Sequence, residues 1–278
     1  MTRKIVTLVP AYNEQDAIGA TIEALLEQTR MPDVIVIIPN GCTDRTAEIA
    51  RSYVSDDNPL VVFELPRLEH KKSEALNKAW VRYGLNADII VCLDADTICP
   101  PDTIRQWELD FVDGEMALQS RQGKKPRQTQ RLGGVSSKAT MPKPGFWSRL
   151  QKAEFAKWTD TSLIRGYTTV LAGTGCAIDN EVLRQIVSET GRPGPWSYTS
   201  AVEDFELTTQ IRIRGYRCIV SPHVRVYTDS MTTLRTLWPQ RMKWATGTIE
   251  ELFNHGFNRY TIVDWSQQAL GLFMLFAR

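Results

Sequence analysis

The stretch Ala87-Asp-Ile-Ile-Val-Cys-Leu-Asp-Ala-Asp96 decides the fold class of this chain. Five consecutive apolar residues lead into two aspartates, which is typical of a strand that is buried on both faces and ends at a polar edge of its sheet. We predict a strand at residues 88–93 and three similar strands at residues 4–9, 34–38 and 60–63. Segments of helical periodicity separate these strands, which predicts an α/β fold with a mostly parallel sheet flanked by helices. These segments are residues 15–28, 43–53 and 71–83.

The second half of the chain has a less regular pattern. Residues 121–145 are rich in Lys, Arg, Gln, Ser, Gly and Pro, which predicts a long exposed loop. We divide the chain into an α/β half at 1–120, a second half of the same domain at 121–230 and a C-terminal helical segment at 231–278. Within these ranges we expect helices at 146–164, 180–187 and 205–214 (ended by Gly215), a glycine-interrupted strand at 169–178, a strand pair at 217–220 and 224–227, and a Trp-rich helical tail from Thr232.

Composition excludes several classes of protein. The 278 residues include 33 basic and 32 acidic side chains, so no global positive field attracts nucleic acid. Five cysteines without a CxxC pair give no metal-ligand spacing, and we expect them to be reduced in a cytoplasmic protein. The apolar run at 269–277 is shorter than the ~20 residues that span a bilayer. We therefore expect this tail to be either an interfacial helix in peripheral contact with a membrane or a helix that packs on the protein.

Asp94-Ala95-Asp96 is the most informative motif, because it follows a predicted strand directly. In open α/β sheets, ligands bind beyond the carboxyl ends of the strands. Two carboxylates there require a cation or protons to coexist, and Mg²⁺ or Mn²⁺ prefers such hard oxygen ligands. The alternative is that both aspartates only cap the following turn.

Polar residues after the other strands converge on the same edge. Tyr12 is placed to stack on a base, Asn13 and Asn40 to bind the base or ribose, and Lys72 to reach a phosphate. Taken singly, each also fits a cap, a turn or a solvated surface. Together with Pro10, Ala11 and Glu14, they predict a nucleotide pocket.

Glu203-Asp204 opens a predicted helix. Two acids at this position complement the positive end of the helix dipole. Alternatively, one of them is a general base, because a carboxylate near like charge or out of water has a raised pKa. The residues alone leave both interpretations open.

Seven signatures in order resemble the family 2 glycosyltransferases of the GT-A fold, in particular the cellulose, hyaluronan and poly-N-acetylglucosamine synthase branch. The resemblance covers roughly residues 4 to 245. The signatures are Val9-Pro-Ala-Tyr-Asn-Glu14, Asn40-Gly-Cys-Thr-Asp-Arg-Thr46, Lys72-Ser-Glu-Ala-Leu-Asn77, Asp94-Ala-Asp96, Gly173-Thr-Gly-Cys176, Glu203-Asp204 and Gln240-Arg-Met-Lys-Trp244.

The resemblance implies a role for each signature. The catalytic base would be Asp204, supported by Glu203, and the metal of a bound nucleotide diphosphate would be held by Asp96 and Asp94. The acceptor site would be bordered by Gly173, Thr174, Gly175 and Cys176, with Trp244 stacking on a sugar or, alternatively, packing in the core beside Trp238. The donor would contact Pro10, Ala11, Tyr12, Asn13, Glu14, Asn40, Lys72, Asp94, Ala95, Asp96, Gln240 and Lys243.

The chain departs from the family pattern at three positions. Lys243 stands at the usual Arg of the Gln-x-x-Arg-Trp motif and offers a point charge instead of a planar fork. Val202 replaces a Thr or Ser, and Lys71 replaces a Gly. These residues also contain no transmembrane helix, so processive polymer export does not follow. His223 is either a structural residue or an additional metal ligand.

We expect a metal-dependent, inverting glycosyltransferase that uses Mn²⁺ or Mg²⁺ and moves a hexose or N-acetylhexosamine from a nucleotide sugar, with UDP as the expected nucleotide. The acceptor is a glycan, a lipid, a protein or a small molecule. The alternatives are a nucleotidyltransferase and a catalytically silent nucleotide-sugar-binding protein. Nucleic-acid binding is not expected, because the basic loop has no interleaved aromatics. Its basic residues are Arg121, Lys124, Lys125, Arg127 and Arg131.

Overall fold

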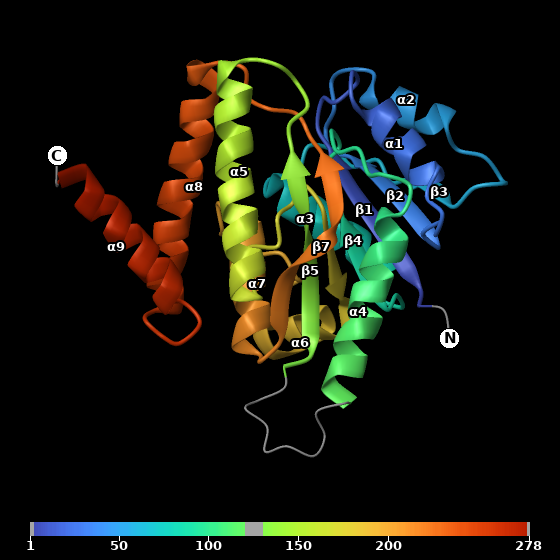
Figure 1. Ribbon diagram of the computed structural model, residues 1–278. Coiled ribbons are helices and arrows are strands. Elements are labelled where there is room, and N and C mark those ends of the chain that lie inside the picture. The colour runs from blue at the N-terminus through green and yellow to red at the C-terminus, as the bar shows by residue number, and fades with distance from the viewer. Residues whose placement is uncertain (1–2, 120–129, 277–278) are drawn as a thin grey trace.

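The computed structural model describes residues 3–119 and 130–276. A single sheet of seven strands forms its centre, with the order β3-β2-β1-β4-β6-β5-β7 (Figure 1). β6 is antiparallel to both of its neighbours, and every other pair is parallel. The prediction of a mostly parallel α/β sheet is confirmed. The division into three ranges stays a prediction.

The first half follows the predicted alternation. Its strands are β1 (Ile5–Ala11), β2 (Val34–Pro39), β3 (Leu60–Val62) and β4 (Ile89–Cys92), each within a few residues of expectation. Its helices are α1 (Ile18–Leu26), α2 (Thr46–Ser52) and α3 (Lys71–Ala79), and α3 continues into a π-helical turn at Trp80–Gly84. The one missed element is α4 (Thr103–Gln119).

The prediction of an exposed loop at 121–145 is wrong for residues 132–140. Residues 120–129, with four of the five basic loop residues, lie outside the described residues, but Leu132–Thr140 forms the buried strand β5. This strand lacks an apolar pattern because it is rich in small residues, and these are required where neighbouring side chains approach its backbone closely. A Cβ on Gly133 would lie 2.6 Å from Ile211 Cγ2, and one on Gly134 would lie 2.3 Å from Leu171 Cδ1. The remaining basic residue, Arg131, is paired with Asp179 at 2.7 Å.

Two further expectations about the second half need correction. The glycine-interrupted strand is shorter than predicted, because only Cys176–Asp179 (β6) pairs. The predicted strand pair is one strand, β7 (Arg217–Tyr227), whose register against β5 shifts between Ser136 and Lys138. The expected C-terminal helical tail is confirmed and consists of two helices, α8 (Leu234–His255) and α9 (Ile262–Phe276). The helices α5 (Phe146–Arg165), α6 (Asn180–Thr190) and α7 (Glu203–Ile213) agree with expectation.

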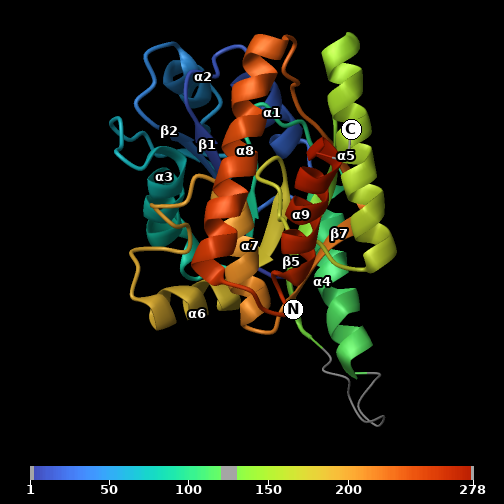
Figure 2. The same cartoon turned by 90° about the vertical axis from the view of Figure 1, so that its left-hand side faces the viewer.

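Two apolar cores lie on opposite faces of the sheet and make a three-layer structure (Figure 2). Residues of α1, α2, α4 and α5 cover one face, where Trp107 and Phe111 are fully buried. Residues of α3, α6 and α7 cover the other. Strands buried on both faces carry continuous apolar runs, which is why the first four were readable in the sequence.

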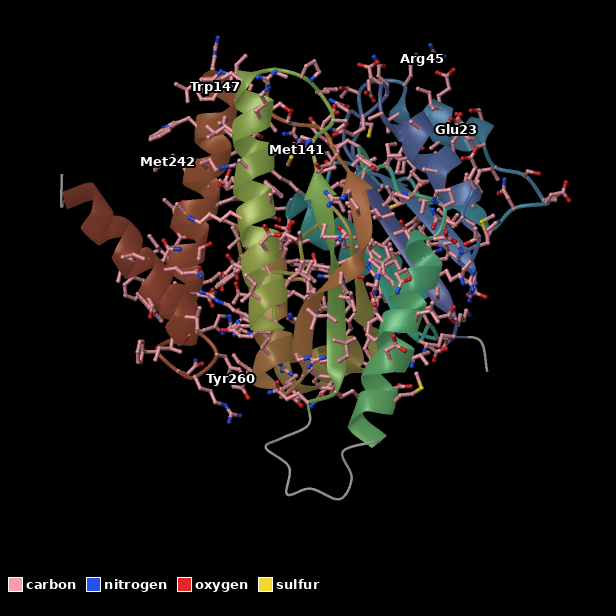
Figure 3. The ribbon with its side chains drawn as sticks, in the orientation of Figure 1. Glu23, Arg45, Met141, Trp147, Met242 and Tyr260 are labelled. Atoms are coloured by element: carbon pink, nitrogen blue, oxygen red, sulfur yellow. The ribbon has the colours of Figure 1, made fainter. Side chains whose placement is uncertain are left out.

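Helix α8 stands outside these layers and packs on α7 through a small cluster of Val202, Phe205 and Leu252. Most of its surface is exposed, and Met242 lies on its outer side (Figure 3). Among the described residues, no helix combines the length and the apolar character needed to cross a bilayer. Membrane contact by the tail stays a prediction.

The loop that leads into α7 is anchored by Asn77, which is 1% exposed. Its Nδ2 donates to the carbonyl of Trp196 at 2.7 Å, and its Oδ1 accepts from the Trp196 amide at 2.9 Å. The backbone can approach this closely only at a glycine, because a Cβ on Gly194 would lie 2.3 Å from Asn77 Oδ1. The loop therefore has a fixed position relative to α3.

Asn77→Ala is expected to lower the free energy of unfolding by about 2–4 kcal/mol, because it leaves two buried backbone groups of Trp196 without partners. Urea denaturation would measure the change. Lys78→Ala, on the next and exposed position of α3, is the matched control. An equal loss in both variants would contradict the anchoring role.

Candidate active site

Polar residues of the N-terminal half meet at the carboxyl edge of the sheet, as expected. Tyr12 follows β1 with its ring 53% exposed, so a face is free for stacking. Asn13 has a φ of 56°, and its Oδ1 accepts from the Thr43 amide at 2.8 Å. Asn40 Oδ1 accepts from the Leu68 amide at 3.2 Å. Both asparagines thus connect neighbouring loops at the sheet edge that carries Tyr12, and these hydrogen bonds hold the loops in position.

The other predicted donor contacts of this region are less accessible. Pro10 is half-buried, and Ala11 and Ala95 are buried.

Four carboxylates cluster at this edge. Asp96 lies near Asp94 and Asp229, and burial together with both negative charges raises its pKa. Thr228 Oγ1 donates to Asp96 Oδ1 at 3.2 Å. Burial and the same three aspartates raise the pKa of Glu14 to about 7. Asp229 was missed in the sequence, although it directly follows the end of β7 as Asp94 follows β4.

The chemistry of this cluster fits a hard divalent cation. Neighbouring negative charges raise the pKa values of Glu14 and Asp96, and a cation would offset these charges. Mg²⁺ or Mn²⁺ is commonly held by one or two carboxylates plus substrate phosphates. Among residues 3–119 and 130–276, no group of three or more His, Cys, Asp or Glu is arranged as a complete metal site. The carboxylates of this cluster would therefore supply part of the coordination of a cation, and a bound anion would supply the rest.

The structure does not bring His223 to this cluster. His223 lies on β7 four residues before Tyr227, roughly 13 Å along the strand. Its titratable neighbour is Asp110 of α4. It is exposed and does not line the pocket.

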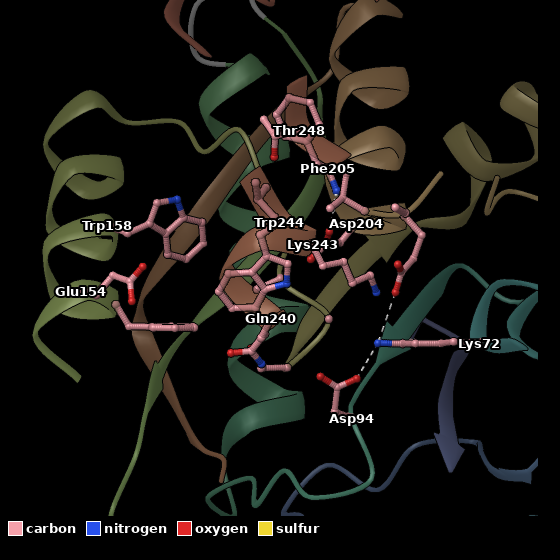
Figure 4. A pocket seen from close by; sticks show the side chains of 18 residues that line it. Lys72, Asp94, Glu154, Trp158, Asp204, Phe205, Gln240, Lys243, Trp244 and Thr248 are labelled. Carbon is pink, nitrogen blue, oxygen red and sulfur yellow. Dashed lines mark hydrogen bonds and ion pairs between the residues drawn. The ribbon is translucent and has the colours of Figure 1, made fainter. Parts of the chain in front are cut away.

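A pocket of about 470 Å³ opens between the sheet edge and helices α5, α7 and α8 (Figure 4). It gathers residues that are far apart in the sequence, from α3 to α8. Of the predicted site residues, those that line it are Lys72, Asp94, Gly173, Thr174, Glu203, Asp204, Gln240, Lys243 and Trp244.

Lys72 lies between the two acidic groups of the pocket. Its Nζ is 2.6 Å from Asp94 Oδ1 and 3.6 Å from Glu203 Oε1, and these carboxylates hold its pKa above the usual range (Figure 4). A Cβ on Gly173 would lie 2.9 Å from Lys72 Nζ, so the glycine leaves the ammonium its space. Lys72 therefore connects the sheet edge to α7.

Asp204 lies in the first turn of α7 and also lines the pocket, a position that is compatible with both interpretations of the acidic pair. Its Oδ1 accepts from the Phe205 amide at 2.8 Å. Burial, with the adjacent charge of Glu203, raises the pKa of Asp204 to about 6, and Lys72 opposes the shift. A carboxylate with this pKa is mostly unprotonated at neutral pH and is still basic enough to accept a proton.

The glycine signature divides between surface and interior. Gly173 and Thr174 line the pocket. Gly175 and Cys176 are buried behind them, where a Cβ on Gly175 would lie 3.1 Å from Ser137 Oγ and Cys176 pairs with Cys92 across the sheet.

Helix α5 supplies pocket residues that sequence reasoning missed. Glu154 and Trp158 lie opposite Asp204, and Phe155 of the same helix also lines the pocket; we call these three residues the α5 wall (Figure 4). No motif surrounds them, and their helical spacing is the same as that of core residues. Trp244 completes this wall from α8, 37% exposed and with its ring centroid 6.3 Å from that of Phe155.

Several curated proteins are similar to this chain in sequence. The poly-β-1,6-N-acetyl-D-glucosamine synthase of Staphylococcus aureus is 24% identical over 259 residues, which are 91% of this chain and 57% of that protein. The synthase of Staphylococcus epidermidis is 23% identical over 88% of this chain and 54% of its own. The chain thus spans little more than half the length of these relatives.

Two solved structures share the GT-A fold. The mannosyltransferase PcManGT from Pyrobaculum calidifontis, in complex with GDP-Man and Mn²⁺, has a TM-score of 0.64 and 20% identity, covering 92% of this chain and 64% of that one. S. aureus TarS 1–349, in complex with UDP-GlcNAc, has a TM-score of 0.58 and 15% identity, covering 90% and 66%.

A family model matches residues 3–247, which include the acidic cluster at the sheet edge and all of the pocket residues up to Trp244. Its description is "Glycosyltransferase like family 2". The chain belongs to this family.

Proposed function

We propose that the chain is an inverting glycosyltransferase that depends on a divalent cation and uses a nucleotide sugar as donor. One observation carries the proposal: Asp204, a carboxylate with a pKa raised to about 6, faces the same pocket as Asp94. A proton acceptor thus lies next to a place where a diphosphate and its cation fit. If Glu203 and Asp204 only stabilised the start of α7, Asp204 would not have to face the same pocket as Asp94.

UDP-N-acetylglucosamine is the donor to be tested first. Relatives that match 91% of the chain are named as synthases of an N-acetylglucosamine polymer, and TarS, which shares the fold, binds UDP-GlcNAc. The exposed ring of Tyr12 offers a stacking face for uracil. The acceptor proposed first is an N-acetylglucosamine oligosaccharide, because the far wall of the pocket combines aromatic rings with polar groups.

The residues divide the reaction between them. Asp204 takes the proton of the acceptor hydroxyl as that oxygen attacks the anomeric carbon from the face opposite the leaving group. A single displacement of this kind inverts the configuration. Asp94 and Asp96 would hold the Mn²⁺ or Mg²⁺, which would offset the charge growing on the departing UDP. Lys72 places a further positive charge at the same edge.

The test is calorimetric titration of UDP with Mn²⁺ and then with EDTA. We expect Mn²⁺-dependent binding that weakens by about tenfold or more without the ion, because the diphosphate and the carboxylates would then repel each other. Asp96→Asn should weaken Mn²⁺-dependent binding in the same way, and Asp160→Asn, an exposed aspartate on α5, is the control.

Turnover of UDP-N-acetylglucosamine separates the proposal from its rivals. Release of UDP supports glycosyl transfer, and release of pyrophosphate would indicate a nucleotidyltransferase. Binding of UDP without turnover of any UDP-sugar would indicate a catalytically silent binding protein. Failure to bind UDP or GDP under either metal condition would overturn the proposal.

A further inference from the structure

Arg241, between the predicted site residues Gln240 and Lys243, has a side chain with partners on two helices. Its Nε and Nη2 both donate to Oε2 of Glu154 on α5, at 3.1 and 2.6 Å. Its Nη1 donates to Oε1 of Gln240 at 2.7 Å. The guanidinium carbon lies 4.3 Å from the centroid of the Trp244 ring. One planar cation thus joins three residues that line the pocket.

These contacts help to hold Trp244 in position at the pocket wall. Most side chains of α8 are exposed, and Trp244 has an aromatic edge contact only with Phe155 among the described residues. Arg241 covers one part of the indole by a cation–π contact. The guanidinium is itself held by Glu154, so the ring is fixed relative to both α5 and α8.

An ordered aromatic ring at a pocket wall favours a ligand with an apolar face. Each side chain that must be ordered on binding weakens the affinity, and a ring already held in position avoids that loss. The C–H face of a pyranose packs on such a ring, while Glu154, whose second oxygen Oε1 has no partner among the described residues, can accept from a sugar hydroxyl.

We propose that Arg241 is a positioning residue for a saccharide acceptor: by bridging Glu154 and Trp244, it holds the aromatic wall of the pocket ready for the acceptor's sugar ring. This inference rests on the proposed function. Lysine at this position would keep a charge near Trp244 but would lose the planar fork that reaches Glu154 and Gln240 together.

The experiment measures steady-state transfer from UDP-N-acetylglucosamine to a β-1,6-linked N-acetylglucosamine tetrasaccharide. Arg241→Met is expected to raise the acceptor KM about tenfold, because the ring loses a cation–π contact and its charged hydrogen-bonded support. kcat and UDP affinity should change by less than about twofold. Arg241→Lys should restore part of the acceptor KM. Arg82→Met, which removes an arginine from the rings of Phe63 and Tyr83 outside the pocket, is the control.

A double-mutant cycle with Trp244→Ala tests whether Arg241 acts through this ring. The combined variant should have nearly the acceptor KM of Trp244→Ala alone, because Arg241 then has no ring left to hold. Additive effects would overturn the inference, as would an Arg241→Met variant with weaker UDP binding and an unchanged acceptor KM. If wild-type protein binds UDP but does not transfer to the tetrasaccharide, the acceptor class is wrong and the inference falls with it. If UDP does not bind, the proposed function fails first.

Discussion

Asp204→Asn is expected to reduce sugar transfer by about 10³-fold while leaving UDP affinity unchanged, within the range that general bases contribute. Asparagine has nearly the same shape and can still accept the Phe205 amide at Oδ1, so the start of α7 should be preserved. It cannot take a proton from an acceptor hydroxyl. Transfer would be measured as UDP release in the presence of acceptor, and UDP binding by calorimetry.

The pH profile gives this prediction a second readout. The base acts only when unprotonated, so the wild-type rate should rise with pH through the Asp204 pKa of about 6 and level off above it. Asp204→Asn should lose this acid limb together with the rate. Asp160→Asn should keep both. Transfer near the wild-type rate by Asp204→Asn would show that another group is the base.

Lys72→Met is expected to lower kcat/KM for the donor roughly 10²-fold, the upper range for loss of a charge-assisted hydrogen bond. Lys72 Nζ lies 2.6 Å from Asp94 Oδ1, and without this ammonium the carboxylates of the pocket repel one another and a bound diphosphate. Its positive charge also lowers the pKa of Asp204. Removing that charge should therefore move the acid limb to a pH above the wild-type value, so the loss is greatest in mildly acidic buffer.

Lys71→Met is the matched control for this change. Lys71 precedes Lys72 in α3, but its side chain is exposed and lies outside the pocket. Kinetics across pH would compare the two variants with wild-type protein. An acid limb that stays in place, or that moves to lower pH in Lys72→Met, would contradict the electrostatic link between Lys72 and Asp204.

The fold was predictable where burial leaves a strong pattern. Strands β1, β2 and β4 are covered on both faces, so their residues are continuously apolar and their positions could be recognised. β5 could not, because glycines and serines fill it and its burial depends on how closely Ile211 and Leu171 approach. Local composition indicated a loop, and tertiary packing overrode it.

Some residues of the candidate site could likewise be recognised in the sequence, and others could not. Motif residues such as Asp94 and Asp204 stand directly after a strand or at the start of a helix and belong to an ordered set of signatures, so they could be recognised in the sequence. Glu154 and Trp158 lie within a continuous helix with no such signal. Asp229 follows a strand whose end was predicted, and that position was the available signal for it.

The sequence by itself determined the α/β architecture, the order of the strand-end motifs and the family resemblance, because each depends on residues that are near one another in the chain. Only the tertiary structure decided that Lys72 bridges Asp94 and Glu203, that Asp229 joins the acidic cluster and that Arg241 connects α5 to α8. These contacts join residues separated by tens to more than a hundred positions. Their energies depend on distance and burial in the folded chain, and neither quantity is written in the local sequence pattern.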